Sequence, residues 1–196
     1  MKLLALLLIG LLSPVFAAVE VGKPAENFTL TDTQGKTHSL TDFKGKFVVL
    51  EWYNPDCPFV RKHYDSSNMQ TLQKTYVNKG VVWLSINSSA TGKQGNYSPE
   101  EYNKIAAEKK TSPTALLLDH DGKVGHLYGA KTTPHIFIIN PEGNLIYQGG
   151  IDNKPSADPA DIATAENYVK STLDAAMAGN PVTVSTSKPY GCGVKY

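Results

Sequence analysis

The residue best placed for chemistry in this chain is Cys57, which follows an apolar run and precedes a proline. Pro58 fits the first position of a helix, because its missing N–H has no intrahelical partner there. Cys57 is then the expected N-cap residue, where free backbone N–H groups and the helix macrodipole favour the thiolate, the nucleophilic form of cysteine. The pattern predicts a reactive thiol. Half of a structural disulfide, or a small buried apolar residue, is the alternative.

A second thiol lies close to the C-terminus, at Cys192, and it is flanked by two glycines. Such glycines predict an accessible and pliable backbone. A flexible tail with a thiol suits a resolving cysteine that reaches back to Cys57 and prevents its oxidation beyond sulfenic acid. The alternative is a static disulfide that ties the tail to the body of the protein. Both interpretations are open from the sequence.

The elements that must position these cysteines follow from apolar runs separated by turn residues. Hairpins are predicted at 28–40 and 136–147, and buried strands at 47–52, 81–86 and 115–118. Helices are predicted at 58–79 (interrupted near 65–68), 98–110, 124–128 and 158–178. This alternation of strands and helices predicts a three-layer α/β/α domain with a central mixed sheet and an N-terminal hairpin.

The N-terminal segment, residues 1–17, has the composition of a secretory signal peptide. A basic second residue precedes an apolar run from Leu3 to Leu12, and small residues end at Ala17. The run is too short for a permanent membrane anchor, and no other apolar stretch approaches membrane length. We therefore expect a periplasmic or secreted protein with one domain over 18–180 and a tail over 181–196. The formal net charge of +1 indicates no strong field for nucleic acid.

With these elements in order, the chain resembles the thioredoxin fold. More narrowly it resembles the peroxiredoxin-like branch, the alkyl hydroperoxide reductase and thiol-specific antioxidant group. The resemblance covers about residues 20–178 and rests on segments 51–58, 115–122, 128–134 and 136–149. It implies an exported thiol oxidoreductase with an antioxidant or disulfide-redox role and no cofactor or metal. It further implies a peroxide or protein disulfide as substrate, and an external thiol donor, a thioredoxin-like protein or a small thiol.

The resemblance also implies roles for three more residues. Members of the fold have a cis peptide bond facing the reactive cysteine, which corresponds here to Thr133-Pro134, and the backbone of Thr133 would pair with an extended thiol substrate. An ordinary trans proline is the alternative. Glu51 stands where thioredoxins place a buried carboxylate, which can relay a proton from a thiol. Capping of the sheet edge, or pairing with a lysine, is an equally weighted interpretation of Glu51.

Two departures from these families bear on activity. Val60 stands three residues after Cys57, so the Cys-x-x-Cys exchange of thioredoxins within one helical turn is impossible. Leu50 and Asn54 stand where peroxiredoxins have Pro and Thr or Ser, so the hydroxyl that orients a peroxide is missing. Slow peroxide reduction with retained disulfide exchange is therefore expected. A disulfide reductase without peroxidase activity is one alternative reading. A non-catalytic copper carrier or a disulfide-stapled binding module is another.

The histidines complete the candidates. His135 follows the Thr-Pro pair, and Cys57 with His135 or His63 would be a possible soft-metal pair, as in copper-delivering proteins of the same fold. Those proteins use two cysteines close together, and this chain lacks the nearer one. The other histidines are expected on the surface, and the short basic run 61–63 is expected on a solvated helix face.

Overall fold

The protein is described here by a computed structural model over residues 19–196, and the predicted signal peptide, 1–17, lies outside the described residues. One mixed sheet has the strand order β2-β1-β5-β4-β3-β7-β8. Its strands are β1 (Thr29–Asp32), β2 (Thr37–Ser39), β3 (Val48–Trp52), β4 (Val82–Asn87), β5 (Ala115–Leu118), β7 (His135–Ile139) and β8 (Leu145–Gly149). Strand β3 is parallel to β4, and β4 is parallel to β5, while the remaining pairs are antiparallel.

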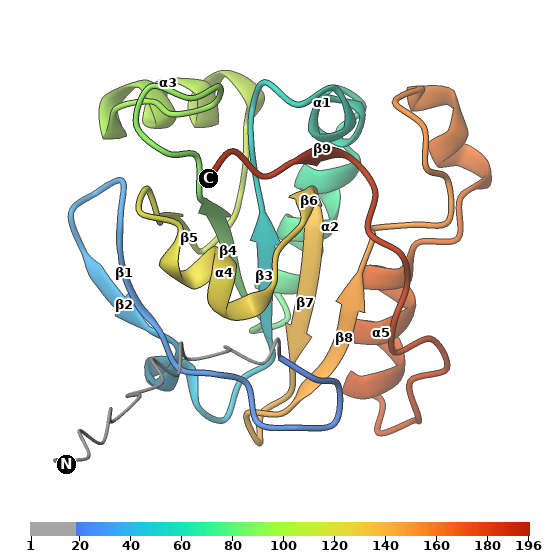
Figure 1. Ribbon diagram of the computed structural model, residues 1–196. Helices are drawn as coiled ribbons and strands as arrows, with labels where there is room; N and C mark the ends of the chain where they lie inside the picture. Colours follow the sequence, from blue (N-terminus) through green and yellow to red (C-terminus); the bar gives the residue numbers. More distant parts are fainter. Residues whose placement is uncertain (1–18) are drawn as a thin grey trace, which may run out of the picture.

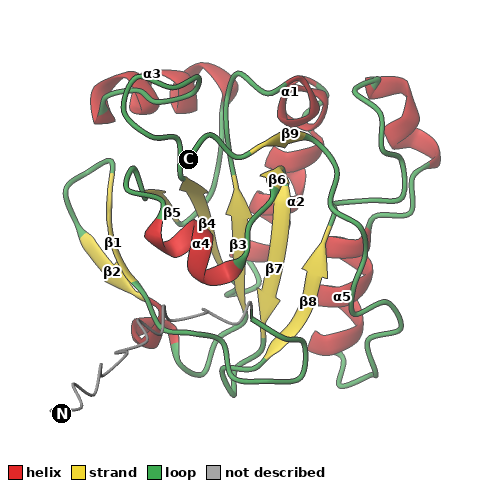
Figure 2. Cartoon of the chain, in the orientation of Figure 1, coloured by secondary structure: helices red, strands yellow, loops and turns green. Residues whose placement is uncertain are grey.

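Helices cover both faces of this sheet (Figures 1 and 2). They are α1 (Pro58–Asp65), α2 (Asn68–Val77), α3 (Pro99–Lys109), α4 (Lys123–Tyr128) and α5 (Tyr168–Met177), with 3-10 turns η1 (Leu40–Phe43) and η2 (Pro159–Thr164). Val49 of β3 packs in a cluster with side chains of α1, α2 and α5, whereas Leu50 and Trp52 pack with side chains of α4. Because both faces are covered, every residue of β3 is buried. The predicted three-layer α/β/α architecture is confirmed.

Strand pairing brings the candidate residues to one edge of the sheet. Trp52, at the end of β3, is paired with His135, at the start of the antiparallel strand β7. The chain that leaves β3 towards α1 and the chain that enters β7 therefore meet at this edge. Cys57 lies on the first of these segments and Thr133-Pro134 on the second, so residues more than seventy positions apart become neighbours.

Most predicted elements are confirmed, and one helix is corrected. The predicted interruption near 65–68 separates α1 from α2, with Ser67 in the left-handed region at φ 63°. The single helix predicted over 158–178 is wrong, because the chain breaks between η2 and α5. Asn167 begins α5 by accepting a hydrogen bond from the Lys170 N–H, and the segment before it pairs with the Asp152 region. Among residues 19–196, the helices are all too short or too polar to span a membrane.

The C-terminal tail is docked, which corrects the prediction of a loose segment. Its first part pairs with β8, since Gln148 N–H donates to Ser185 O at 3.1 Å and Ser187 N–H donates to Gln148 O at 3.1 Å. It then passes the N-terminal end of α1 as strand β9 (Cys192–Gly193), which pairs with β6 (Thr132–Thr133) (Figure 1). The last residue, Tyr196, donates to Ala130 O at 2.9 Å. The tail's own backbone pairing holds it against the domain.

Candidate active site

Cys57 occupies the position that the sequence predicts. It is the N-cap of α1, with extended dihedral angles (φ −73°, ψ 124°), and Pro58 follows at the first helical position. Its Sγ–H donates to the backbone carbonyl of Thr133 at 3.0 Å, and the Thr133-Pro134 peptide bond is cis. The predicted cis bond and its proximity to the thiol are both confirmed.

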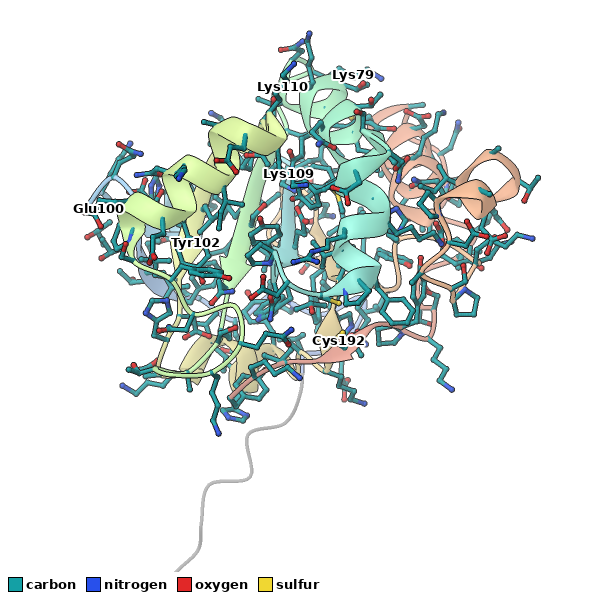
Figure 3. The ribbon with its side chains drawn as sticks, turned by 90° about the horizontal axis from the view of Figure 1, so that it is seen from above. Lys79, Glu100, Tyr102, Lys109, Lys110 and Cys192 are labelled. Atoms are coloured by element: carbon teal, nitrogen blue, oxygen red, sulfur yellow. The ribbon has the colours of Figure 1, made fainter. Side chains whose placement is uncertain are left out.

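The second cysteine lies beside the first. Strands β6 and β9 are antiparallel, with Thr133 opposite Cys192, and both cysteines are free thiols. Figure 3 shows Cys192 on the tail where it passes the start of α1. Cys57 is 0% exposed. The sequence predicts a reactive thiol, with a small buried residue as the alternative; Cys57 is buried, and the tail strand β9 passes beside it.

The surroundings shift the pKa values of the two thiols in opposite directions. Burial raises the pKa of Cys57, but donors near its sulfur favour the thiolate and lower the pKa overall: the Thr133 side chain, the thiol and N–H of Cys192, and the Val60 N–H. Thr133 Oγ1 is buried and has no hydrogen-bond partner among the described residues, so its hydroxyl is available to donate to a thiolate. Burial and the neighbouring Cys57 raise the pKa of Cys192 to about 11. Cys57 is the better candidate for the thiolate.

Gly191 explains why the tail can approach so closely. Its φ of +140° lies in the region that favours glycine, and a Cβ built there would overlap the Thr133 carbonyl. Gly193, on the other side of Cys192, has space, since the nearest atom to a Cβ there is Lys131 O at 4.0 Å. The two glycines that flank the cysteine are therefore not equivalent: only the first is required by contact.

Glu51, on strand β3, is completely buried. Its carboxylate accepts hydrogen bonds from Tyr64 Oη at 2.8 Å, Trp83 Nε1 at 2.8 Å, Ser85 Oγ at 3.0 Å and Gln73 Nε2 at 3.2 Å. Burial raises its pKa, against the opposing effect of these donors. The interpretation of a buried carboxylate is confirmed, and the lysine pair is wrong. Cys57 is not among the groups bonded to Glu51, so a proton relay between them remains a prediction.

Asn54 shapes the loop between β3 and α1. Its amide Nδ2 donates to Gln94 O at 3.1 Å, and its Oδ1 accepts from the Asp56 N–H at 2.9 Å. The side chain is 2% exposed, and Gly95 packs so closely that a Cβ there would overlap it. The buried Asn54 side chain is therefore held in place by one N–H of its amide and by its Oδ1.

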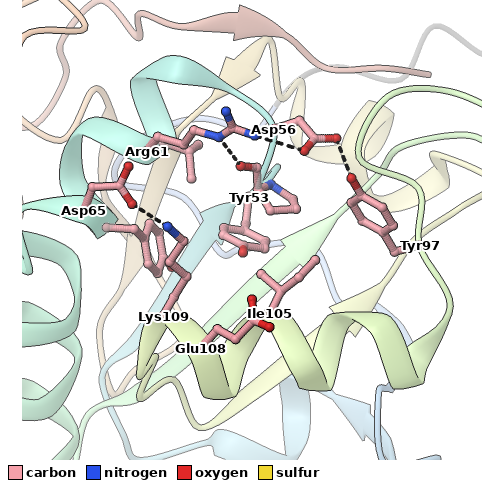
Figure 4. Close-up of a pocket in the computed structure, with 11 residues that line it drawn as sticks. Tyr53, Asp56, Arg61, Asp65, Tyr97, Ile105, Glu108 and Lys109 are labelled. Carbon is pink, nitrogen blue, oxygen red and sulfur yellow. Dashed lines mark hydrogen bonds and ion pairs between the residues drawn. The ribbon is translucent and has the colours of Figure 1, made fainter.

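A cavity of about 310 Å³ lies next to this loop, between α1 and α3 (Figure 4). Cys57 does not line it. Arg61 donates to Pro55 O at 3.1 Å and pairs with Asp56 at 3.4 Å, while Tyr97 donates to the other oxygen of Asp56 at 2.9 Å. These contacts hold the loop that carries Cys57. The cavity therefore lies next to the site but does not lead to the Cys57 thiol.

The basic run predicted on a solvated face is largely buried, which corrects that expectation. Arg61 is exposed, but Lys62 is 1% exposed and His63 is 0% exposed. Lys62 Nζ donates to Lys154 O at 2.8 Å, and burial lowers the pKa of His63 to about 4. Both side chains lie near Asp152, a residue that sequence reasoning did not select. No local pattern links Asp152 to α1, because it follows β8, about ninety residues further along the chain.

His135 also differs from expectation. Its Nδ1 accepts from the Lys131 N–H at 3.2 Å and its ring packs on Phe137 at 4.4 Å, within the cluster on the α4 side of the sheet. Cys57 packs in the cluster on the opposite face. The two residues therefore do not form a pair. Within residues 19–196, no group of three metal-ligating side chains is assembled.

Comparison with known proteins identifies similar chains. The model of the AhpC/TSA family matches residues 21–148, which include Glu51, Cys57, Thr133 and Pro134 but exclude the tail. A thiol-disulfide oxidoreductase, ResA, of Bacillus thuringiensis is 30% identical over 130 residues, covering 66% of this chain and 69% of that protein. An uncharacterized conserved protein of Geobacillus kaustophilus has a solved structure that is 29% identical, with a TM-score of 0.75 over 90% of this chain and 92% of that one.

A more distant structure supports the fold alone. It is a putative thiol:disulfide interchange protein, DsbE, of Chlorobium tepidum, 24% identical, with a TM-score of 0.55 over 67% of this chain and 85% of that one. The family model covers the sheet, the first cysteine and the cis proline. Cys192 lies beyond the residues matched by the family model.

Replacing Gly191 tests whether the tail protects Cys57. We expect Gly191→Ala to displace the tail, because the added Cβ overlaps the Thr133 carbonyl. The limiting rate of Cys57 alkylation by iodoacetamide at high pH should rise at least severalfold as the cover is lost. The apparent pKa of Cys57 should rise as well, because the donors of Cys192 withdraw from the thiolate. Rates are measured across pH by mass spectrometry of the Cys57 peptide.

The matched control for this experiment is Gly193→Ala. It adds the same methyl group on the other side of Cys192, where the nearest atom is 4.0 Å away. We expect its alkylation profile to follow that of the wild-type protein. Equal profiles for Gly191→Ala and wild type would show that the tail does not control access to Cys57.

Replacing Glu51 tests its effect on stability. Burial raises its pKa in the folded state, so the native protein binds a proton that the unfolded chain has lost. The free energy of unfolding should therefore fall as pH rises from the unfolded pKa, about 4.3, towards the folded value. Glu51→Gln keeps the shape and removes the titration, so this part of the pH dependence should disappear. Urea unfolding from pH 4 to 8 measures it, and an unchanged slope would contradict the assignment.

Proposed function

We propose that this chain, which belongs to the AhpC/TSA family, is a thiol–disulfide oxidoreductase in which Cys57 is the nucleophile and Cys192 the resolving thiol. One observation carries the proposal: the Cys57 thiol caps a helix, donates to the carbonyl that precedes a cis proline, and lies beside a second free thiol on the strand paired with Thr133. The reaction class is supported by the names of the relatives, and the pairing of the two cysteines is supported by the docked tail.

In the first step, the Cys57 thiolate attacks one sulfur of a substrate disulfide. The substrate S–S bond breaks as the new bond to Cys57 forms, and the other substrate sulfur leaves with the electron pair and takes a proton. The Thr133 side chain and the Val60 N–H stabilise the attacking thiolate. The backbone of Thr133, at an edge strand, is suited to hold an extended substrate.

In the second step, Cys192 attacks the Cys57 sulfur of the mixed disulfide. The remaining substrate thiolate leaves, and a Cys57–Cys192 disulfide forms, so the substrate gains two electrons and the protein loses two. In the reduced protein, the hydrogen bond and charge of Cys57 help to hold the pKa of Cys192 at about 11. Both effects vanish once Cys57 is bonded to the substrate, and nearby Lys195 then favours the Cys192 thiolate. The resolving thiol is activated by the first step.

The geometry favours disulfide exchange over peroxide reduction. Peroxide cleavage needs donors aimed at the oxygen on which charge develops. Asn54 stands in place of the missing hydroxyl, but its side chain is buried and held by bonds to Gln94 O and the Asp56 N–H. Disulfide exchange needs a thiolate, access and a backbone partner. An antioxidant role by direct peroxide reduction is therefore the secondary candidate, supported by the family alone.

We place this reaction outside the cytoplasm, with an external thiol donor as the reductant. The support is the secretory pattern of residues 1–17. Export to an oxidising compartment is consistent with a protein that forms and breaks disulfides. The donor, a thioredoxin-like protein or a small thiol, must reduce the Cys57–Cys192 bond to complete each cycle. A bond that resists reduction until the protein unfolds would instead support the structural staple.

The Cys192→Ser variant tests the division of roles. It should react once with bis(2-hydroxyethyl) disulfide and then accumulate the mixed disulfide on Cys57, because no second thiol is present to displace the substrate. Cys57→Ser should show no reaction above background. Mass spectrometry of quenched samples measures both outcomes, with the wild-type protein yielding an internal disulfide. Turnover of Cys192→Ser at the wild-type rate with a thiol donor would contradict the resolving role.

Relative rates with two oxidants test the reaction class. Stopped-flow mixing of the reduced protein with hydrogen peroxide and with a model disulfide, at matched pH, should give the faster reaction with the disulfide. The reason is that Asn54, which replaces the peroxide-orienting hydroxyl, is buried and held by bonds to Gln94 O and the Asp56 N–H. Rapid peroxide consumption that disappears in Cys57→Ser would reverse this order and establish a peroxidase. No reaction with either oxidant would favour a non-catalytic module.

A further inference from the structure

The tail occupies the place that an extended substrate must take. Strand β9 forms the antiparallel pair with Thr132–Thr133, and its Cys192 lies opposite Thr133, beside Cys57. A substrate segment that pairs with the same strand in the same register brings its own cysteine to Cys57. The residues before that cysteine then contact the same surfaces as the residues before Cys192. The tail therefore shows what the groove accepts.

The position immediately before the cysteine accepts only glycine. Gly191 lies against the Thr133 carbonyl, where a Cβ would overlap backbone atoms, and its φ of +140° is unfavourable for other residues. Backbone atoms of a strand cannot rotate away as a side chain can. Any segment bound in this register meets the same restriction.

The position two before the cysteine enters a polar socket. We define the Tyr190 socket as Phe59, Lys62, His63 and Asp152, which surround the ring of Tyr190. The Tyr190 hydroxyl donates to Asp152 Oδ1 at 2.6 Å, and His63 Nε2 lies 3.2 Å from the Tyr190 hydroxyl oxygen. The ring meets Phe59 edge-on at 6.0 Å, and Lys62 Nζ lies 5.5 Å from its centre. Tyr190 itself is 9% exposed.

The hydrogen bonds of the socket require a hydroxyl. Asn68 Nδ2 lies 2.9 Å from His63 Nδ1, so a neutral His63 accepts there and donates from Nε2 to the tyrosine oxygen. That oxygen in turn donates its proton to Asp152. A phenylalanine would leave the His63 N–H and one Asp152 lone pair without this partner. Buried polar groups left unpaired are costly, and bonds to a charged group are among the strongest in proteins.

From these contacts we propose that the Tyr190 socket and the Thr133 edge together form a recognition site for an extended peptide segment of the form tyrosine-glycine-cysteine. The reduced protein fills the site with its own tail, and a disulfide-bonded substrate segment of the same form fills it when the tail withdraws. The inference rests on the proposed function, because it concerns the substrate that Cys57 attacks. It names the substrate class as a peptide disulfide read at the two residues before its cysteine.

Synthetic peptides test the inference. The probe is Lys-Pro-Tyr-Gly-Cys-Gly with its cysteine joined to 2-nitro-5-thiobenzoate, mixed with the full-length reduced Cys192→Ser variant. Attack of Cys57 on the peptide sulfur breaks the S–S bond and releases the coloured arylthiolate. Replacing the tyrosine of the peptide by phenylalanine should slow release about tenfold or more, since a hydrogen bond to a charged group is lost. Replacing the glycine before the cysteine by alanine should slow it at least as much.

Two controls separate recognition from general reactivity. Replacing the last glycine of the peptide by alanine corresponds to Gly193, where there is space, and should leave the rate within about twofold. In the protein, Asp152→Asn keeps an acceptor but removes the charge, so it should reduce the preference for the tyrosine peptide over the phenylalanine peptide. If that variant does not fold, Tyr190→Phe serves instead: its tail is held less tightly, so all peptides should react faster while the preference for tyrosine persists.

The outcomes distinguish this inference from the proposed function. Equal rates for the tyrosine and phenylalanine peptides, or no reaction with any peptide, together with normal reaction with bis(2-hydroxyethyl) disulfide, would overturn the recognition site and leave the oxidoreductase intact. No reaction of Cys57 with the small disulfide either would overturn the proposed function, and the recognition site with it. A loss of rate confined to the phenylalanine and alanine peptides supports the site.

Discussion

The carbonyl group of Thr133 is the point on which the site depends. It accepts the Sγ–H of Cys57 at 3.0 Å, and it excludes any side chain at Gly191. The backbone on which it lies pairs with Cys192. Both cysteines are therefore positioned by the short strand β6: Cys57 through its bond to the Thr133 carbonyl, and Cys192 through strand pairing. The distance between the two thiols is set by backbone geometry rather than by the rotamers of long side chains. A thiolate at Cys57 loses its bond to this carbonyl and keeps the donors around it, which couples ionisation to the arrangement of the tail.

The energetic cost of this arrangement lies in its burial. Cys57, Glu51 and Lys62 are each almost completely removed from solvent. An unpaired charge in such a buried position is strongly destabilising. Each is matched by partners: donors around the Cys57 sulfur, four donors on Glu51, and the Lys154 carbonyl with Asp152 near Lys62. The polar interior is therefore specific, because moving any one element leaves a buried group without its partner. Moving the tail has this effect at Cys57 and at the Tyr190 socket together.

This coupling gives the tail two opposing effects on reactivity. It supplies donors that lower the pKa of Cys57, and it covers the sulfur that must be reached. A substrate that pairs with the same strand replaces the tail's backbone contacts as it removes the cover. Segments that also match Gly191 and Tyr190 restore more of the lost interactions than segments that do not. Selectivity then follows from competition for one strand edge rather than from a separate pocket.

The sequence by itself determined the architecture and the first thiol. Continuous apolar runs predict strands buried on both faces, such as 47–52, and the proline after Cys57 predicts its capping position, because both depend on neighbours in the chain. The helix at 158–178 was predicted in one piece because its break depends on pairing with the distant Asp152 region. Only the tertiary structure decided the docking of the tail, the burial of Lys62 and His63, and the socket around Tyr190. Those contacts join α1, the segment after β8 and the C-terminus, and no local pattern of residues records which of them will meet.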